Sequence, residues 1–262
     1  MPLGGNRLSS SSSKKSRRRQ KPSAAASETT ALVNSSTRTI QSVYDISRKV
    51  FAVARPGFLP PKGSVAELSR FLNDLTLQDV GLDANMPFFR ADAQGHPKVT
   101  YLHFADTPKF TVGVFCLPRS AVIPLHNHPG MTVFSKILLG SMHITSYDWV
   151  KPQAASGATA TTTQEGAQLA QLKAEHEYDA SSKTMVLYPE EGGNLHRFIA
   201  TTPCAVLDVM GPPYRRDQGR DCSYYSTYAV AAPGGDGQYA WLREVPCTFD
   251  LDAFSMRPRI RE

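Results

Sequence analysis

The spacing of apolar residues predicts two helices in the first third of the chain. Over residues 39–53 the apolar positions approximate a 3.6-residue period, the period of a single buried helix face. The segment "SVAELSRFLNDL" at 64–75 follows the same period, and Ser64 with Glu67 forms a capping-box pattern. We therefore expect two amphipathic helices before the main body of the fold.

From about residue 98 the pattern changes to short segments rich in Val, Ile, Phe, Thr and Tyr. Gly, Pro, Asn and Asp separate these segments, as is typical of strands joined by turns. Many short strands at this spacing favour a mainly β sandwich or barrel over alternating strands and helices. The expected strands are 99–104, 110–116, 121–127, 132–138, 141–149, 184–188, 195–200, 204–209, 224–230 and 238–245.

Two regions depart from this pattern. Residues 1–36 are rich in Ser, Ala and basic residues and nearly free of aromatics, so we expect a disordered tail. Residues 151–183 are polar and rich in Ala, Thr and Gln, and we interpret them as a surface insertion with one short helix. The rest, residues 37–262, is expected to be a single domain.

The positive charge of the chain is concentrated in this tail. Eight of the 29 Lys and Arg but only one of the 23 Asp and Glu lie in residues 1–40, which leaves 21 basic and 22 acidic residues elsewhere. The net charge of +6 therefore does not predict a nucleic-acid-binding surface on the domain. The cluster "KKSRRRQK" at 14–21 is typical of a nuclear localisation signal, although a solvated charged tail has the same composition.

The sequence also sets expectations about compartment and partners. It holds no apolar run long enough for a transmembrane helix and no secretory leader. Its four cysteines include no CxxC pair, which favours reduced thiols in an intracellular protein. We expect a monomer in the nucleus and cytoplasm that does not associate with membranes.

Candidate chemistry begins with two histidines in the segment "PLHNHPG". On a strand, residues two apart point to the same face, so His126 and His128 could bind one metal ion. An isolated pair of this kind is more often a chance surface or core pair. A third histidine, His196, follows a similar Pro/Gly-rich turn in "VLYPEEGGNLHRF". Three neutral imidazoles suit Zn, Fe, Cu or Ni and leave coordination positions open for a substrate.

These residues resemble the two motifs of the cupin barrel, a double-stranded β-helix or jelly roll. His126, His128 and Gly140 fit the first motif, and the Pro/Gly turn before His196 fits the second more loosely. Val133 stands where the cupin motif usually has a glutamate. The resemblance thus implies a cupin fold with N-terminal helices and a branch with three histidines and no carboxylate ligand.

The resemblance is more specific within that branch. The segments "LPRSAVIPLHNHPGMTVFSKILLGSMHITSYDW", "YPEEGGNLHRF" and "AVLDVMGPPY" are similar to the plant cysteine oxidases, thiol dioxygenases related to animal cysteamine dioxygenase. The similarity covers roughly residues 40 to 260. It implies an Fe(II) cofactor held by His126, His128 and His196, and O₂ as a co-substrate.

The family resemblance also implies the substrate and its fate. An N-terminal cysteine of a protein could bind Fe(II) through its sulfur and its free α-amine, leaving a position for O₂. Adding both oxygen atoms to sulfur gives a cysteine sulfinic acid. Such oxidation marks the protein for an oxygen-dependent N-degron pathway of degradation, as in oxygen sensing and the hypoxia response.

Three further residues are candidates for catalysis or substrate binding. Asp208 is a charge in an otherwise apolar strand; it could orient a ligand histidine or bind the substrate amine, or form a structural hydrogen bond. Tyr214 could point its hydroxyl into the site or pack in a loop. Cys222 could line the cavity or act as a small buried hydrophobe. Of the other histidines, His143 is expected to line the pocket or to be a satisfied core residue, His103 to be structural, and His96 and His176 to be solvent-exposed.

Three alternatives remain open from the sequence. A zinc hydrolase or lyase would use the same three ligands, although no clear general base stands beside them. A dioxygenase could act on small free thiols instead of a peptide terminus. A metal-binding cupin module without enzymatic activity is the third alternative.

Overall fold

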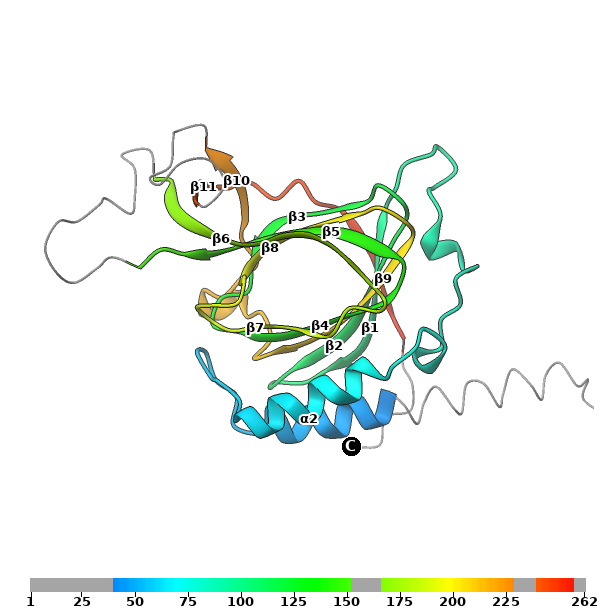
Figure 1. Ribbon diagram of the computed structural model, residues 1–262, viewed down its shortest axis with the longest axis horizontal. Helices are drawn as coiled ribbons and strands as arrows, with labels where there is room; N and C mark the ends of the chain where they lie inside the picture. The colour runs from blue at the N-terminus through cyan, green and yellow to red at the C-terminus, as the bar shows by residue number, and fades with distance from the viewer. Residues whose placement is uncertain (1–39, 152–165, 229–238, 257–262) are drawn as a thin grey trace, which may run out of the picture.

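The computed structural model describes residues 40–151, 166–228 and 239–256 (Figure 1). The expected basic tail at 1–36 lies outside the described residues. No helix in the described part is long and apolar enough to cross a membrane. The labelled elements are α2 (Lys62–Asn73), η1 (Gln78–Val80), η2 (Pro87–Phe89), β1 (Val99–Asp106), β2 (Thr111–Leu117), β3 (Val122–Asn127), β4 (Thr132–Leu139), β5 (Ser141–Trp149), β6 (Gln168–Asp179), β7 (Met185–Leu187), β8 (Leu195–Ala200), β9 (Cys204–Gly211), η3 (Arg216–Gln218), β10 (Tyr224–Tyr228), β11 (Tyr239–Val245) and β12 (Leu251–Ser255).

The strands form two sheets that lie face to face (Figure 1). One sheet has the strand order β12-β1-β2-β9-β4-β7, and the other, β10-β11-β6-β5-β8-β3, closes into a barrel through a contact between β10 and β3. Successive strands from β2 to β5, and again from β7 to β10, alternate between the sheets. This alternation is the double-stranded β-helix, so the predicted fold class is confirmed.

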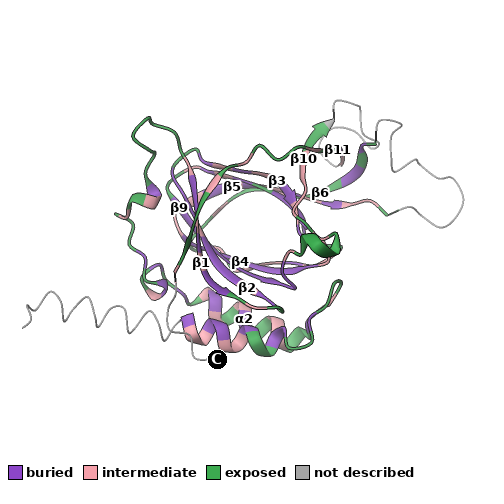
Figure 2. Ribbon diagram, turned by 180° about the vertical axis from the view of Figure 1, so that it is seen from behind, coloured by how far each residue is buried: buried purple, intermediate pink, exposed green. Residues whose placement is uncertain are grey.

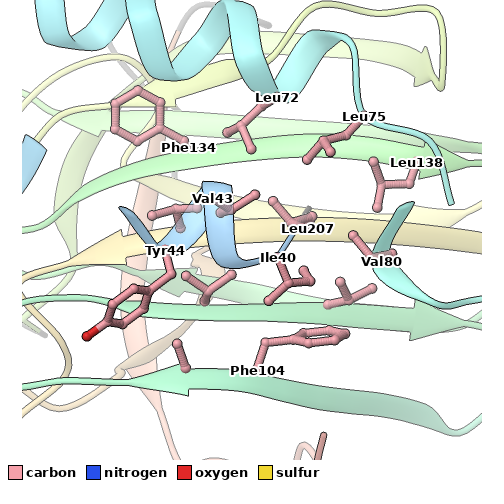
Figure 3. Close-up of a cluster of buried hydrophobic side chains, with 14 of the residues drawn as sticks. Ile40, Val43, Tyr44, Leu72, Leu75, Val80, Phe104, Phe134, Leu138 and Leu207 are labelled. Carbon is pink, nitrogen blue, oxygen red and sulfur yellow. The ribbon is translucent and has the colours of Figure 1, made fainter. Parts of the chain in front are cut away.

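Helix packing explains why the outer face of the first sheet is apolar. A helix over residues 40–50 and α2 cover the outer face of the sheet that holds β1, β2, β4 and β9 (Figures 1 and 2). Phe134 and Leu138 of β4 point toward the helices and belong to the same buried cluster as Val43, Leu72 and Leu75 (Figure 3). Burying each such side chain contributes about 1.5–3 kcal/mol. Val133 and Ile137 of the same strand belong to clusters outside this helix-covered core.

The start of α2 differs from the prediction. The helix begins at Lys62, and its N-cap is Pro61, with no side-chain capping hydrogen bond. Pro61 has the extended backbone conformation that its ring favours (φ −55°, ψ 141°), and the chain enters the helix directly after it. The predicted capping box of Ser64 and Glu67 is therefore wrong, because Ser64 is already the third residue of the helix.

The polar insertion is also corrected in part. Its second half is not a helix but strand β6, which pairs with β5 and with β11. Ten of its twelve residues are exposed or partly exposed, which explains a composition without the usual strand pattern. Residues 152–165 lie outside the described part of the chain. Strand β12, which the sequence did not predict, pairs in parallel with β1 at the edge of the first sheet.

Candidate metal centre

The three predicted metal ligands lie together on neighbouring strands of the second sheet. His126 is near the end of β3, and His128 follows that strand by one residue. His196 is the second residue of β8 and lies directly opposite His126 in the antiparallel pairing. Opposite residues of paired strands point to the same face. His196 therefore lies beside His126 and His128, although it is 68 residues beyond His128 in the chain.

The three imidazoles are close enough to share one ion. Their ring centroids are 5.0 Å apart for His126 and His128, 4.7 Å for His126 and His196, and 4.8 Å for His128 and His196. One nitrogen from each ring lies within 4.8 Å of the others, and the two Nε2 atoms of His128 and His196 are 3.0 Å apart. All three side chains are buried.

Hydrogen bonds at Nδ1 place the ring proton there on His126 and His128, so that their Nε2 atoms carry lone pairs. Nδ1 of His126 donates to the backbone oxygen of Pro124 at 2.8 Å. The Tyr214 hydroxyl donates to the backbone oxygen of Asn127 at 2.8 Å, and therefore accepts from Nδ1 of His128, also at 2.8 Å. A histidine held in this way presents the lone pair of Nε2 to a metal.

The electrostatic surroundings keep these imidazoles neutral. Burial lowers the pKa of His126 to about 4. Burial, reinforced by the neighbouring histidines, lowers the pKa of His128 and of His196 well below the usual 6.5. The neutral imidazole is the form that binds a metal, so the donor set fits Fe, Zn, Cu or Ni.

No carboxylate joins this group among the residues that the structure describes. Val133, which occupies the place of the usual glutamate, is fully buried. It packs with Met131, Leu187 and Met210, and the ring of Tyr214 lies against this cluster. A metal bound here would therefore have three neutral protein ligands.

A buried carboxylate holds the loop that leads to His196. Asp148 of β5 accepts hydrogen bonds from the backbone N–H groups of Gly192 at 2.9 Å, Gly193 at 2.9 Å and Asn194 at 3.0 Å. Both glycines have a positive φ, and a Cβ on Gly193 would lie 2.5 Å from the Ser146 hydroxyl. The loop thus requires glycine and a fixed acceptor.

Asn194 then joins the two histidine segments. Its side-chain oxygen accepts from the backbone N–H of His128 at 3.1 Å, and its side-chain nitrogen donates to the backbone oxygens of His128 at 3.1 Å and Tyr188 at 2.8 Å. Since His196 is two residues further on, this side chain sets the position of one ligand segment against the other. Neither Asp148 nor Asn194 was predicted from the sequence; the signal that points to Asn194 is its place two residues before His196.

A cavity of about 390 Å³ opens beside the histidines, between the two sheets. Its walls include His126 and His128 together with all three further candidates, Asp208, Tyr214 and Cys222. Residues that the sequence analysis did not assign to the site also line it: Tyr101, His103, Asp106, Thr111, Tyr224 and Phe249. His103 was expected to be structural, but it is part of the cavity wall. No Lys or Arg is among the described residues that line this cavity.

Asp208 faces the cavity as a buried carboxyl group. The Ser135 hydroxyl donates to its Oδ1 at 2.6 Å. Burial raises the pKa of Asp208 to about 7, although this hydrogen bond opposes the shift. No described histidine donates a hydrogen bond to it. Among the described residues Asp208 therefore does not orient a ligand histidine, and the Ser135 contact is the structural hydrogen bond that the sequence left open as an alternative.

Tyr214 and Cys222 both contact the site. Tyr214 contacts a candidate ligand directly through Nδ1 of His128, so it is not merely a packed loop aromatic. Cys222 is partly buried and interacts with Tyr214 and Tyr224. Burial raises the pKa of the Cys222 thiol, which keeps this thiol protonated at neutral pH.

Comparison with known proteins places the chain in a family. The model of the PCO_ADO family matches residues 71–258. Plant cysteine oxidase 1 of Arabidopsis thaliana is 41% identical over 220 residues, which cover 78% of this chain and 73% of that protein. The 2-aminoethanethiol dioxygenase of Homo sapiens is 30% identical over 220 residues, covering 76% and 80%.

Among solved structures, an RmlC-like cupin protein from Desulfovibrio desulfuricans matches with a TM-score of 0.31 and 14% identity, over 50% of this chain and 97% of that one. The fold assignment rests on the strand order, and the family assignment rests on the sequence relatives. The chain belongs to the PCO_ADO family, the thiol dioxygenases that its histidine segments resemble.

Proposed function

We propose that this protein is an Fe(II)-dependent dioxygenase that oxidises the N-terminal cysteine of protein substrates to cysteine sulfinic acid. In the balanced reaction, R–SH and O₂ give R–SO₂H, so both oxygen atoms go to sulfur. The observation that carries the proposal is the set of three neutral, buried histidines beside a cavity. A bound ferrous ion would supply the positions at which a thiolate and O₂ meet.

The residues of the cavity suit a substrate with an amino group. Asp208 and Asp106 line it, and no described Lys or Arg does, so an approaching ammonium group meets only acidic or neutral side chains. Asp208, with a pKa of about 7, can accept a hydrogen bond from the amine or take up one of its protons. This would leave the neutral amine, which is the form able to bind a metal.

Other residues of the chain hold the site in place. Tyr214 fixes the tautomer of His128, while Asp148 and Asn194 fix the loop before His196. Apolar side chains, among them Ile123, Phe198 and Met210, form part of the cavity wall, and a low-dielectric wall strengthens electrostatic interactions beside it.

A dioxygenase of small free aminothiols is the second candidate, because relatives at 30–31% identity are named 2-aminoethanethiol dioxygenase. The greater identity of 41–43% to two plant cysteine oxidases favours a cysteine substrate. Both candidate functions use the same metal site. Their substrates differ in whether the aminothiol group is part of a peptide chain or of a small free molecule.

The test compares substrates and atmospheres. Fe(II)-loaded protein is incubated with a peptide that begins with Cys, the same peptide N-acetylated, and free cysteine, each under air and under nitrogen. We expect the free-amine peptide alone to gain two oxygen atoms, and only in air, as measured by mass spectrometry. Oxidation of free cysteine but not of the peptide would instead support the second candidate. Zinc-loaded protein is expected to be inactive, in contrast to a zinc hydrolase.

A matched pair of histidine variants tests the ligand assignment. His196→Ala is expected to lose bound iron and all measurable oxidation, whereas His176→Ala, at an exposed position of β6, should retain both. Iron per protein is measured by elemental analysis. Unchanged iron content and activity in His196→Ala would overturn the proposed site.

We further propose that the oxidised products enter an oxygen-dependent N-degron pathway and that the protein acts in the nucleus and cytoplasm. The support is the basic cluster at 14–21 together with the family resemblance. Replacing the six basic residues of this cluster by Ala in a fluorescent fusion should reduce nuclear signal. An unchanged distribution would show that the cluster is only a solvated tail.

A further inference from the structure

Tyr101 of β1 reaches across a neighbouring strand inside the cavity. Its ring lies over Gly113 of β2: a Cβ added to Gly113 would be 2.2 Å from the Tyr101 hydroxyl and 2.3 Å from the ring carbons Cε2 and Cζ. Such contacts are far shorter than atoms tolerate. Glycine at this position therefore makes room for the tyrosine.

The strand register shows where this ring is directed. Gly113 pairs with Asp208 on the next strand, β9, and Tyr101 itself pairs with Phe115. A side chain that extends from β1 over Gly113 is directed toward Asp208. The two groups are close enough for the charge of Asp208 to raise the pKa of Tyr101, after the larger effect of burial.

The ring is held rigidly, while its hydroxyl is left available. Phe115 and His103 pack against it, with ring centroids 4.6 Å and 5.7 Å away. Within the described part of the chain, no group forms a hydrogen bond with the Tyr101 hydroxyl. With its raised pKa, this phenol remains a protonated donor on the cavity wall. A donor that is fixed on the cavity wall and has no partner among the described residues is available to a ligand that enters the cavity.

We propose that Tyr101 donates a hydrogen bond to the carbonyl oxygen of the first substrate residue, while Asp208 contacts the amine of that residue. This inference rests on the proposed function and adds a specificity determinant to it. In an N-terminal cysteine, the amine and the carbonyl carbon are attached to the same Cα. A carboxylate and a hydroxyl on neighbouring strands match that pair of groups. An aminothiol without a carbonyl would use Asp208 alone.

The experiment compares two small thiols that differ only in this group, L-cysteinamide and 2-aminoethanethiol, together with a Cys-initiated peptide. Tyr101→Phe removes the hydroxyl and keeps the ring. It should raise KM for the peptide and for cysteinamide roughly 3- to 10-fold, the size expected for one neutral hydrogen bond. KM for 2-aminoethanethiol, or its Ki against the peptide if it is not oxidised, should stay within about twofold.

Controls separate this role from a structural one. Tyr44→Phe deletes the same atom in the first helix, outside the cavity. It should change KM for neither cysteinamide nor 2-aminoethanethiol. Gly113→Ala, which displaces the Tyr101 ring, should reproduce the selective effect. Bound iron and melting temperature are measured for each variant and are expected to be unchanged in Tyr101→Phe.

The outcomes distinguish the two levels of the proposal. If the wild-type protein oxidises no thiol, the proposed function fails. If the wild type is active but Tyr101→Phe changes cysteinamide and 2-aminoethanethiol equally, or neither, only the role of Tyr101 is overturned.

Discussion

The two faces of the first sheet are built on different principles. The outer face packs against the helices through apolar side chains such as Phe134, Leu138 and Leu207. The inner face, on the same strands, presents Ser135 and Asp208 to each other. Hydrophobic contacts on the outer face depend on volume and area, whereas each polar group inside depends on one particular partner. Stability and chemistry are thus divided between the two sides of a single sheet.

The largest effect on stability is expected from the outer face. Phe134→Ala removes a fully buried ring that meets Phe51 edge-on and should lower the free energy of unfolding by about 3–5 kcal/mol. Urea unfolding measures this loss. The affinity of the folded variant for iron should remain that of the wild type. A parallel loss of iron affinity would show that the outer face also determines metal binding, and would contradict this division of roles.

On the inner face, Asp208 should make stability depend on pH. Its pKa is about 7 in the folded protein, against a usual value of 3.8. The folded state therefore keeps this proton to higher pH than the unfolded state, and stability falls as pH rises from about 4 to about 7. Asp208→Asn should remove about 2–4 kcal/mol of this fall. Urea unfolding of both metal-free proteins at about pH 5 and about pH 8 gives the difference; identical pH dependence would contradict the assignment.

Asn194→Ala should reduce iron affinity more than stability, the reverse of the effects expected for Phe134→Ala. Asn194→Ala leaves three backbone groups of the histidine segments without their partner, which should lower the free energy of unfolding by about 1–3 kcal/mol. Iron affinity, however, should fall roughly 10- to 100-fold. The comparison requires a direct metal titration of the two variants. Equal iron affinities would show that Asn194 only stabilises the fold.

The smallest changes sharpen the comparison most. Leu138→Met keeps the volume of an outer-face residue and should lower the free energy of unfolding by less than about 1.5 kcal/mol, with no change in activity.

Ser135→Ala removes the hydroxyl that donates to Asp208, so the pKa of Asp208 should rise further and the pH profile of oxidation should move to higher pH. Unfolding curves and pH–rate profiles of the two variants provide the check. An unmoved profile in Ser135→Ala would remove Asp208 from the reaction.

The sequence predicts those parts of the molecule whose signals are local. Short apolar segments identify most of the strands, and two spaced motifs identify the three histidines. Strand β6 was missed because much of its surface is exposed, so its composition resembles that of a loop. Asp148 and Tyr101 were missed for another reason. Asp148 accepts hydrogen bonds from backbone groups of a loop that is distant in the sequence. The position of Tyr101 depends on Gly113 of the neighbouring strand. Neither relation can be recognised before the fold is known.

The central claim is that three histidines support the transfer of both atoms of O₂ to an N-terminal cysteine. The most direct measurement is mass spectrometry of a Cys-initiated peptide oxidised by the Fe(II)-loaded protein under oxygen-18 gas in ordinary water. We expect a sulfinic acid that carries two oxygen-18 atoms. A product with fewer labelled atoms, or one whose oxygen comes from water, would contradict it.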